Sequence, residues 1–116
     1  MSAGDVKILR NAGARITDDV LRTLILATYL LNVKRVLVMP HTDCRMASGS
    51  EEQIHKAIFE ASGVDTKSIQ IKTVTDQISA LKDDVASIKR YSMLPKDLEV
   101  VGAIFDVRSG SLKEVC

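Results

Sequence analysis

The stretch VLVMPHTDC, residues 36–44, decides the fold that we predict for this chain. Residues 36–39 are all apolar, and such an uninterrupted run is typical of a strand covered on both faces in a parallel sheet. Pro40 ends the run, and His41, Asp43 and Cys44 follow within four residues. Ligands bind beyond the carboxyl ends of the strands in sheets of this kind. The loop after Pro40 is therefore the first place to look for a functional site.

Apolar runs and helical periodicities alternate on both sides of this stretch. The runs that we expect to form strands are residues 6–9, 36–39, 100–105 and, after a turn at Ser109-Gly110, a return strand at 112–115. The residues that we expect to cap helices are Thr17, Ser50 and Thr75. This order predicts an α/β fold with a mostly parallel sheet flanked by helices and one antiparallel edge strand.

The apolar faces of the helices give more detailed expectations. Leu26 and Leu30 widen the stripe of the first helix, so we expect it to be buried on more than one side. Ser50 and Gln53 have the spacing of a capping box, and this second helix should end near Gly63. The expected inner face of the second helix consists of Ile54, Ala57, Ile58 and Ala61. For the third helix the expected face consists of Ile78, Leu81, Val85 and Ile88.

Composition limits the class of protein. The 116 residues suit a single domain, 1–116, and 46% of them are hydrophobic, enough for a core. The net charge of +1 gives no electrostatic reason to expect nucleic acid or a membrane surface as partner. We also see no membrane-spanning stretch and no secretory signal. With only two cysteines, at 44 and 116, a reducing cytoplasm is the expected compartment.

His41 and Cys44 are the candidate metal ligands. Imidazole and thiolate are common zinc ligands, and their spacing would let both point at one ion. The alternative is a loop histidine beside a cysteine that acts as a small apolar residue, because the sequence offers no evident third ligand. Asp43 could orient a ligand or close the loop by hydrogen bonds to the backbone.

For the other polar residues we expect roles in structure and not in a functional site. His55 should be solvated on the second helix, and Cys116 should belong to a frayed terminus. Arg10 should make a surface salt bridge, although it could also meet an anion. The acidic residues expected on helix surfaces are Asp18, Asp19, Asp83 and Asp84.

Three separated motifs resemble the β-class carbonic anhydrases. They are ILRNAGARITDDVLRTLILA at residues 8–27, RVLVMPHTDC at 35–44 and GAIFDVRSGSLKEV at 102–115. The resemblance implies a zinc lyase that interconverts carbon dioxide and bicarbonate, and a homo-oligomer. In that family two cysteines and a histidine hold Zn²⁺, while water, hydroxide or an aspartate takes the fourth position. His41 and Cys44 match the second and third protein ligands of this pattern.

Two departures from the family pattern affect the expected activity. The Cys-x-Asp-x-Arg motif that carries the first ligand and the catalytic Asp–Arg pair is not found in this sequence, nor is the N-terminal helical arm. Its strand would lie between the strands expected at 6–9 and 36–39, so we expect an incomplete domain, truncated at the N-terminus. Arg45 stands where the family commonly has glycine.

These departures leave several functions open. The chain would be a carbonic anhydrase whose activity is impaired when it acts alone, with no catalytic residue assigned in it. Alternatively, it would be a non-catalytic relative serving as an oligomer subunit or binding module, because a sheet lacking a strand exposes an edge. A third hypothesis is a redox-active thiol at Cys44, favoured by the nearby Arg45.

Overall fold

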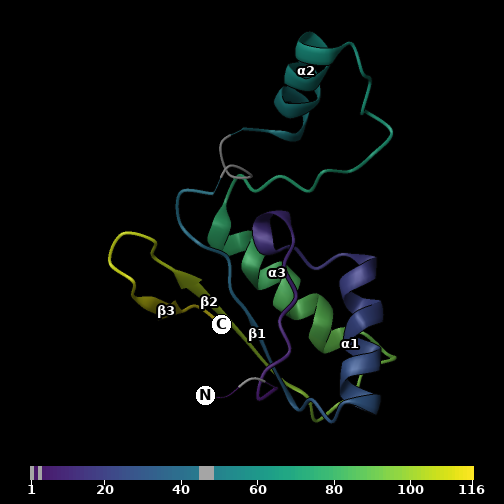
Figure 1. The fold of residues 1–116 in the computed structure, drawn as a ribbon, viewed down its shortest axis with the longest axis vertical. Helices are drawn as coiled ribbons and strands as arrows, with labels where there is room; N and C mark the ends of the chain where they lie inside the picture. Colours follow the sequence, from purple (N-terminus) through teal and green to yellow (C-terminus); the bar gives the residue numbers. More distant parts are fainter. Residues whose placement is uncertain (1, 3, 45–48) are drawn as a thin grey trace.

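The computed structural model describes residues 2, 4–44 and 49–116. Its elements, in chain order, are η1 (Ala12–Ala14), α1 (Asp18–Leu30), β1 (Arg35–Val38), α2 (Glu51–Ser62), α3 (Gln77–Arg90), β2 (Glu99–Phe105) and β3 (Leu112–Glu114) (Figure 1). The longest, α3, has 14 residues. None of the helices in the described ranges has the length and apolar character needed to cross a membrane.

The strands form one mixed sheet in the order β1-β2-β3. β1 runs parallel to β2, with Val36 beside Val100, and β3 returns antiparallel to β2. The chain crosses from β1 to β2 through α2 and α3, as a parallel pair requires. The predicted α/β fold with an antiparallel edge strand is therefore confirmed, and each of these strands begins and ends within one residue of its predicted limits.

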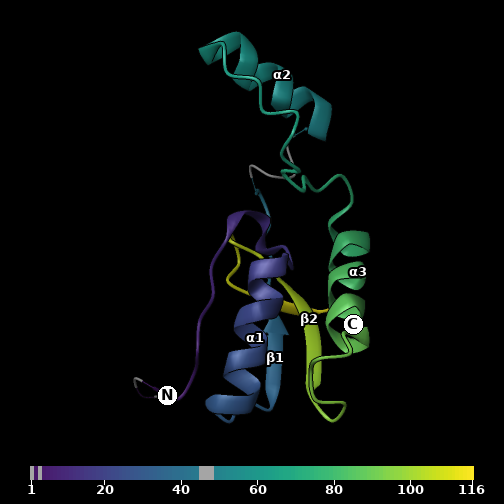
Figure 2. The same cartoon turned by 90° about the vertical axis from the view of Figure 1, so that its right-hand side faces the viewer.

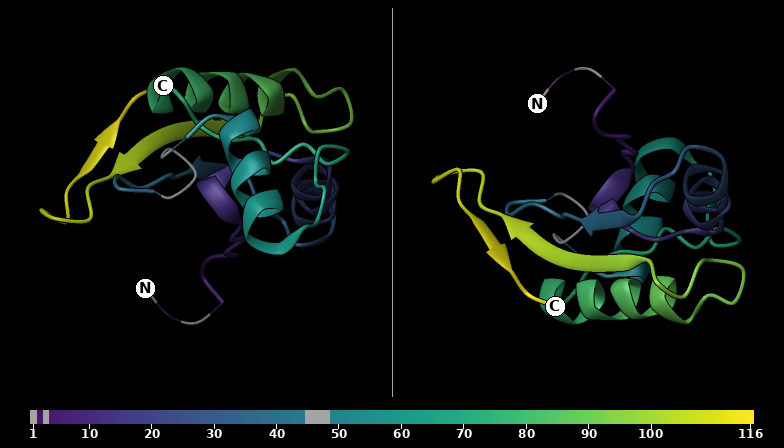
Figure 3. Two further views of the ribbon diagram at one scale, coloured as in Figure 1. Left: turned by 90° about the horizontal axis from the view of Figure 1, so that it is seen from above. Right: turned by 90° about the horizontal axis from the view of Figure 1, so that it is seen from below.

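Helices α1 and α3 pack against the sheet face that carries Val38 and Val100. Leu24 of α1 and Val85 of α3 join these two valines in one buried cluster. On the same face, Gly102 of β2 lets α3 approach closely, because a Cβ atom there would lie only 2.9 Å from Cγ2 of Val85. Seen from above and from below, α3 lies alongside β2 (Figure 3).

The opposite face of β1 is not covered as predicted. Leu37 is 51% exposed and Met39 46% exposed, so the expectation of a strand buried on both faces is wrong for the described residues. The broad burial expected for α1 is also wrong, because Leu26 and Leu30 are 45% and 74% exposed. The cause is the same in both cases: α1 and α3 contribute to one core on one side of β1, and the widened apolar surfaces face away from it.

Helix α2 stands apart from the sheet and the other helices (Figures 1 and 2). Its predicted signals are confirmed: Ser50 and Gln53 form the capping box, and Gly63 ends the helix in the left-handed conformation. The predicted inner face is only partly correct, since Ile54 and Ile58 are half-buried while the two alanines of that face are exposed. Standing away from the body, α2 has little apolar surface to pack against.

Residues 6–9 do not form the predicted strand. Val6, Ile8 and Leu9 are 48%, 74% and 50% exposed. A strand is stable only when a neighbour supplies hydrogen bonds and an apolar face, and the described residues provide no such neighbour for this segment. The apolar pattern is present, but none of the described strands pairs with it.

Helix α3 begins one residue later than the predicted cap. Asp76, rather than Thr75, is the N-cap, and its Oδ1 accepts a hydrogen bond of 3.1 Å from the Ser79 N–H. Of the predicted apolar face, Leu81, Val85 and Ile88 are buried, whereas Ile78 is 46% exposed. Starting the helix at Gln77 places that side chain beside the loop that follows β1.

Candidate metal centre

The loop after β1 is held by the carboxyl end of β2. The Phe105 N–H donates to the Pro40 carbonyl at 2.9 Å, and the Thr42 N–H donates to the Phe105 carbonyl at 2.9 Å. These two bonds flank His41, which forms an isolated parallel bridge with Phe105. The backbone of His41 therefore continues the sheet for one position beyond Pro40 and has a defined orientation.

The ring of His41 has a hydrogen bond that fixes its tautomer. Nδ1 lies 2.7 Å from the carbonyl oxygen of Thr42. A carbonyl oxygen only accepts, so Nδ1 must carry the proton and donate it. In the neutral ring this leaves the lone pair on Nε2, which is the arrangement found in metal-ligating histidines. The residue is exposed, so Nε2 is accessible to a ligand.

The next two residues of the loop contact the turn between β2 and β3. The Val107 N–H donates to Oγ1 of Thr42 at 3.1 Å, and Nε of Arg108 donates to Oδ2 of Asp43 at 3.2 Å. Asp43 thus pairs with a cation across the loop, a contact that differs from both of its predicted roles. Both side chains of this pair are largely exposed, so the ion pair adds little stability.

Asp106 shapes the turn that makes these contacts. Its carboxylate accepts hydrogen bonds from the backbone N–H groups of Arg108 and Ser109. These bonds, that of Arg108 above all, lower the pKa of Asp106 below its ordinary value. The turn is further closed by Gly110, which has the positive φ of 73° that glycine adopts without strain. The predicted Ser109-Gly110 turn is therefore confirmed.

Cys44 follows His41 by three positions on the same loop and is a half-buried free thiol. In the described part of the chain, no group of three or more His, Cys, Asp or Glu residues comes close enough to hold a metal ion. The loop thus carries the two predicted zinc-type donors, and the described residues place no third donor beside them. Arg45, the predicted departure from the family pattern, lies outside the described residues.

The Arg-Asn-Ala-Gly turn meets the carboxyl end of β1. Oδ1 of Asn11 accepts from the Arg15 N–H at 3.0 Å and Nδ2 of Asn11 donates to the Arg15 carbonyl at 2.7 Å, which closes the turn. Gly13 in this turn, Pro40 and Gln77 line one small crevice. The end of β1, this turn and the start of α3 are therefore neighbours. Arg10 itself is exposed.

Asp84 is not the surface charge that we predicted. It is buried in α3, where its carboxylate accepts from Nε of Arg15 at 2.7 Å, from Nη2 of Arg15 at 3.1 Å and from the Ile16 N–H at 3.2 Å. The carboxylate raises the pKa of Arg15 further, mainly through this hydrogen bond. The three other acidic residues given the same interpretation, Asp18, Asp19 and Asp83, are exposed as expected.

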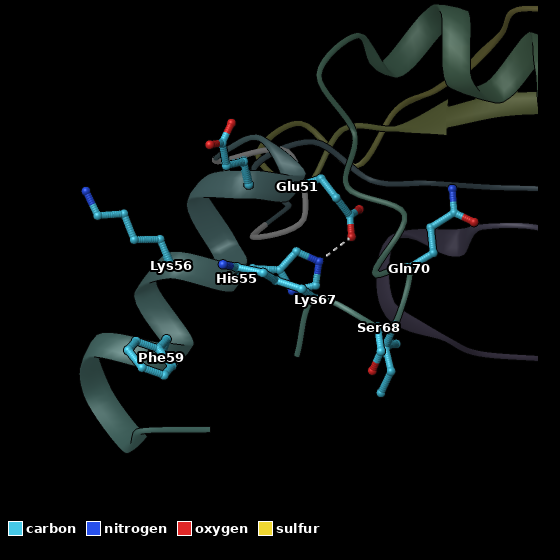
Figure 4. A pocket seen from close by; sticks show the side chains of 9 residues that line it. Glu51, His55, Lys56, Phe59, Lys67, Ser68 and Gln70 are labelled. Atoms are coloured by element: carbon cyan, nitrogen blue, oxygen red, sulfur yellow. Dashed lines mark hydrogen bonds and ion pairs between the residues drawn. The ribbon is translucent and has the colours of Figure 1, made fainter. Parts of the chain in front are cut away.

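The expectation of a solvated His55 is also wrong. His55 is 8% exposed, and its Nε2 donates to Oε2 of Glu51 at 2.9 Å (Figure 4). Its Nδ1 lies 2.7 Å from Oγ1 of Thr66. The loop that follows α2 folds back and covers this ring, which the local helical pattern could not indicate. With both nitrogens engaged, His55 has a structural role and is not available as a ligand.

Glu51 connects α2 to the segment that leads into α3. Its carboxylate accepts hydrogen bonds from the backbone N–H groups of Ile71, Lys72 and Thr73 at 2.7, 2.9 and 3.3 Å. These bonds, that of Ile71 first, hold the pKa of Glu51 below its ordinary value. On the other side, the Lys72 carbonyl accepts from Nη1 of Arg15 at 3.3 Å. This set of contacts links α2 with the body of the molecule.

Cys116 is held in the structure and is not frayed. The Gly102 N–H donates to the Cys116 carbonyl at 2.9 Å, and the Cys116 N–H donates to the Gly102 carbonyl at 3.2 Å. Its half-buried side chain packs against the core cluster. The terminal thiol therefore belongs to the core side of β2 and does not complete a metal site with Cys44.

The fold and the loop chemistry together define a class of protein. Residues 1–69 match the model of the family described as carbonic anhydrase, which is more than half of the chain. The chain belongs to the β-class carbonic anhydrases.

Known proteins place the chain more closely within this class. Beta-carbonic anhydrase 1 of Mycobacterium tuberculosis is 29% identical over 112 residues, which cover 97% of this chain and 68% of that protein. A carbonic anhydrase from Streptococcus mutans has a solved structure that superposes with a TM-score of 0.95 at 33% identity, covering 100% of this chain and 70% of that one. A carbon disulfide hydrolase of Acidithiobacillus thiooxidans is 28% identical, covering 95% of this chain and 58% of that protein.

Zinc, which the family implies, fits the residues of the loop in kind. An imidazole with its free lone pair on Nε2 and a thiol three positions later are donors that zinc prefers. They make up half of the tetrahedral set that zinc takes in proteins. The sequence marked this pair as candidate ligands, and the assignment stays a prediction. Nothing in the sequence marked Thr42 as the residue that holds the ring of His41, or Arg108 and Gln77 as residues that contact the loop.

Proposed function

We propose that Nε2 of His41 and the thiolate of Cys44 are two of the ligands of a Zn²⁺ ion, in a chain that serves the reversible hydration of carbon dioxide to bicarbonate. The observation that carries the proposal is the bond from Nδ1 of His41 to the Thr42 carbonyl, which leaves Nε2 free to bind a metal. Family membership supplies the reaction. We place the protein in the cytoplasm as a homo-oligomer.

The residues of this chain would hold and orient the metal. Phe105 fixes the backbone on both sides of His41, and the Thr42 carbonyl fixes the ring, so the imidazole is pre-organised for one ligand direction. Zinc supplies Lewis acidity and makes hydroxide available near neutral pH. With two donors among the described residues, we expect the 116-residue chain by itself to bind zinc weakly and to hydrate carbon dioxide slowly.

Zinc content and carbon dioxide hydration of the purified chain test this proposal. We expect Cys44→Ser to abolish the zinc that the chain retains, because it removes a thiolate ligand. Cys116→Ser is the matched control, since that thiol packs at Gly102 and should leave the zinc content unchanged. Equal zinc content in wild type and Cys44→Ser would refute the ligand assignment, and turnover typical of the family in the chain alone would refute the expected impairment.

Carbon disulfide is the substrate to assay in parallel. A relative named as a carbon disulfide hydrolase covers most of this chain at 28% identity, close to the 29% of a named carbonic anhydrase. The same zinc-loaded sample should therefore be assayed with both substrates under one set of conditions. Hydration of carbon dioxide is the expected activity, and hydrolysis of carbon disulfide without it would contradict the proposed substrate.

A second candidate is a non-catalytic oligomer subunit. Two observations favour it. Among the described strands β1 pairs with β2 alone, and Leu37 and Met39, on the uncovered face of this segment, are about half exposed. Sedimentation of the purified chain, with and without added zinc, separates the two functions. A stable assembly that binds no zinc and has no activity supports the second candidate, whereas a monomer that melts cooperatively contradicts it.

A further inference from the structure

We propose that Gln77 is a positioning residue of the metal centre: its side-chain amide holds the His41 carbonyl and thereby keeps the imidazole in the tautomer that binds metal. This inference rests on the proposed function, because it assigns a second residue to the same site. Its direct observation is the hydrogen bond of 2.8 Å from Nε2 of Gln77 to the carbonyl oxygen of His41. The two residues are 36 positions apart in the sequence.

The geometry of the sheet explains why His41 needs a donor from outside it. In a parallel ladder, one residue bonds to the two residues that flank its partner. Here Phe105 takes that role, since it bonds to Pro40 and Thr42. The N–H and C=O of His41 itself therefore point away from β2, toward the edge where the described chain has no further strand. Gln77 supplies at that edge the donor that a neighbouring strand would otherwise provide.

The position of Gln77 on α3 makes this contact rigid. Gln77 is the first residue of α3, directly after the N-cap Asp76, whose side chain bonds to the Ser79 N–H. About two turns of α3 are buried in the core through Leu81, Val85 and Ile88. The Gln77 side chain is half-buried beside Pro40, in the crevice at the end of β1. A well-packed helix thus presents the amide to the loop.

The hydrogen bond from Gln77 influences the ring of His41 through the backbone between His41 and Thr42. The His41 carbonyl and the Thr42 N–H belong to the same peptide, which is held by Gln77 on one side and by Phe105 on the other. The Thr42 carbonyl belongs to the next peptide, which begins where this one ends. Fixing the first peptide therefore helps to fix where that carbonyl lies relative to the ring of His41, and with it the bond at Nδ1. Loss of the amide would let the peptide rotate and weaken the tautomer preference. Replacing a residue that orients a metal ligand typically changes metal affinity by about 10- to 100-fold.

The test compares two substitutions that keep the size of the side chain and remove its donor, Gln77→Met and Gln77→Glu. A glutamate at the first position of a helix is compatible with the helix dipole, so Gln77→Glu should keep α3 folded. Gln70→Met and Gln70→Glu are the matched controls, because Gln70 is exposed and its side chain makes no hydrogen bond within the described residues. Melting temperatures of all four full-length variants verify folding.

Two readouts are measured on the full chain. The first is the tautomer of His41 in the metal-free protein, from ¹⁵N–¹H correlations of its ring. The second is the dissociation constant for Zn²⁺ alone, from competition with a chromophoric chelator. We expect both Gln77 variants to shift His41 toward the Nε2–H tautomer and to weaken zinc binding by about tenfold, while both Gln70 variants behave as wild type.

The outcomes separate this inference from the proposed function. Wild-type tautomer and zinc affinity in folded Gln77 variants would overturn the positioning role and leave the ligand assignment intact. A His41→Ala variant that binds zinc as tightly as wild type would overturn both. A lowered melting temperature in the Gln77 variants with an unchanged tautomer would show a merely structural contact and would also overturn the inference.

Discussion

At the scale of single residues, the ion pair of Arg15 and Asp84 connects two distant parts of this chain. Arg15 and Asp84 are 69 positions apart, and their side chains are only 16% and 8% exposed. The pair joins the turn before α1 to the middle of α3, next to the crevice at the end of β1. Removing one partner of a buried pair leaves the other charge without compensation, which costs much more than the pair itself contributes.

We therefore expect Asp84→Asn to lower the free energy of unfolding by about 3 kcal/mol, because Arg15 would keep its charge in a buried position. Urea denaturation at neutral pH measures the change. Asp83→Asn removes the same charge from the neighbouring, exposed position and should cost less than about 0.5 kcal/mol. Similar losses in the two variants would contradict the role of the buried pair.

Glu51 makes the free energy of unfolding depend on pH in the acidic range. Its pKa is lowered in the folded state by the N–H groups of the 71–73 segment, so the ionised form stabilises the fold at neutral pH. This contribution is present above the unfolded-state pKa of about 4.3 and is lost as the pH falls through the lower folded value. We expect Glu51→Gln to be less stable than wild type at pH 7 and the gap to narrow on acidification.

Urea denaturation of wild type and Glu51→Gln between about pH 7 and pH 3 measures that gap. Glu52→Gln is the control, since its side chain is exposed on the same turn of α2. A gap that stays constant over this pH range would mean that the carboxylate of Glu51 does not make these bonds in its ionised form.

At the scale of elements, α3 and β2 are closely packed at Gly102. A Cβ atom there would lie 2.8 Å from Sγ of Cys116, 2.9 Å from Cγ2 of Val85 and 3.0 Å from Cδ1 of Leu81. All three distances are shorter than a normal van der Waals contact. The glycine thus sets the distance between the helix and the sheet, and with it the reach of Gln77.

We expect Gly102→Ala to lower the free energy of unfolding by about 1–3 kcal/mol through overpacking. Thermal or urea denaturation measures the effect. The double variant Gly102→Ala, Cys116→Ala should recover part of the loss, because the nearest atom is removed while the two on α3 remain. If the losses of the two single variants simply add in the double variant, Cys116 does not restrict this position.

Elements specified by their own residues could be predicted from the sequence. Thr17 and the Ser50–Gln53 box cap their helices as expected, and the apolar run before Pro40 forms a strand, Arg35–Val38. The errors concern contacts that depend on residues remote in the sequence. None of the described strands pairs with residues 6–9, Arg15 bonds to the buried Asp84, and the loop after α2 covers His55. At the site, the sequence marked His41 and Cys44 as candidate ligands, and this assignment stays a prediction. It did not mark Gln77, which contacts the loop from 36 positions away in the sequence.

At the scale of the whole molecule, several large apolar side chains are exposed to solvent. Leu30 and Leu31 at the end of α1 are 74% and 55% exposed, Leu37 of β1 is 51% exposed, and Ile8 is 74% exposed. Scattered apolar residues are normal on a protein surface, but several large ones on neighbouring elements are typical of interfaces. This surface agrees with the proposed homo-oligomer.

We expect sedimentation velocity of the purified chain to show species heavier than one chain, with Leu30→Glu shifting the distribution toward monomer, because a charge in an apolar interface is costly. Met93→Glu is the control, at a residue that is 57% exposed in the loop after α3. A monomer at all concentrations in the wild type would contradict the oligomer.

The separation of α2 from the sheet has a consequence for how the protein opens. Within the described residues, α2 is held to the segment at 64–73 by polar bonds of Glu51 and His55 and has little apolar packing. The amide protons of such a unit exchange through local unfolding, whose free energy is well below that of global unfolding. A protease would therefore reach α2 while the sheet is still native, and cleavage there would cut the chain on the C-terminal side of Cys44, the proposed zinc ligand.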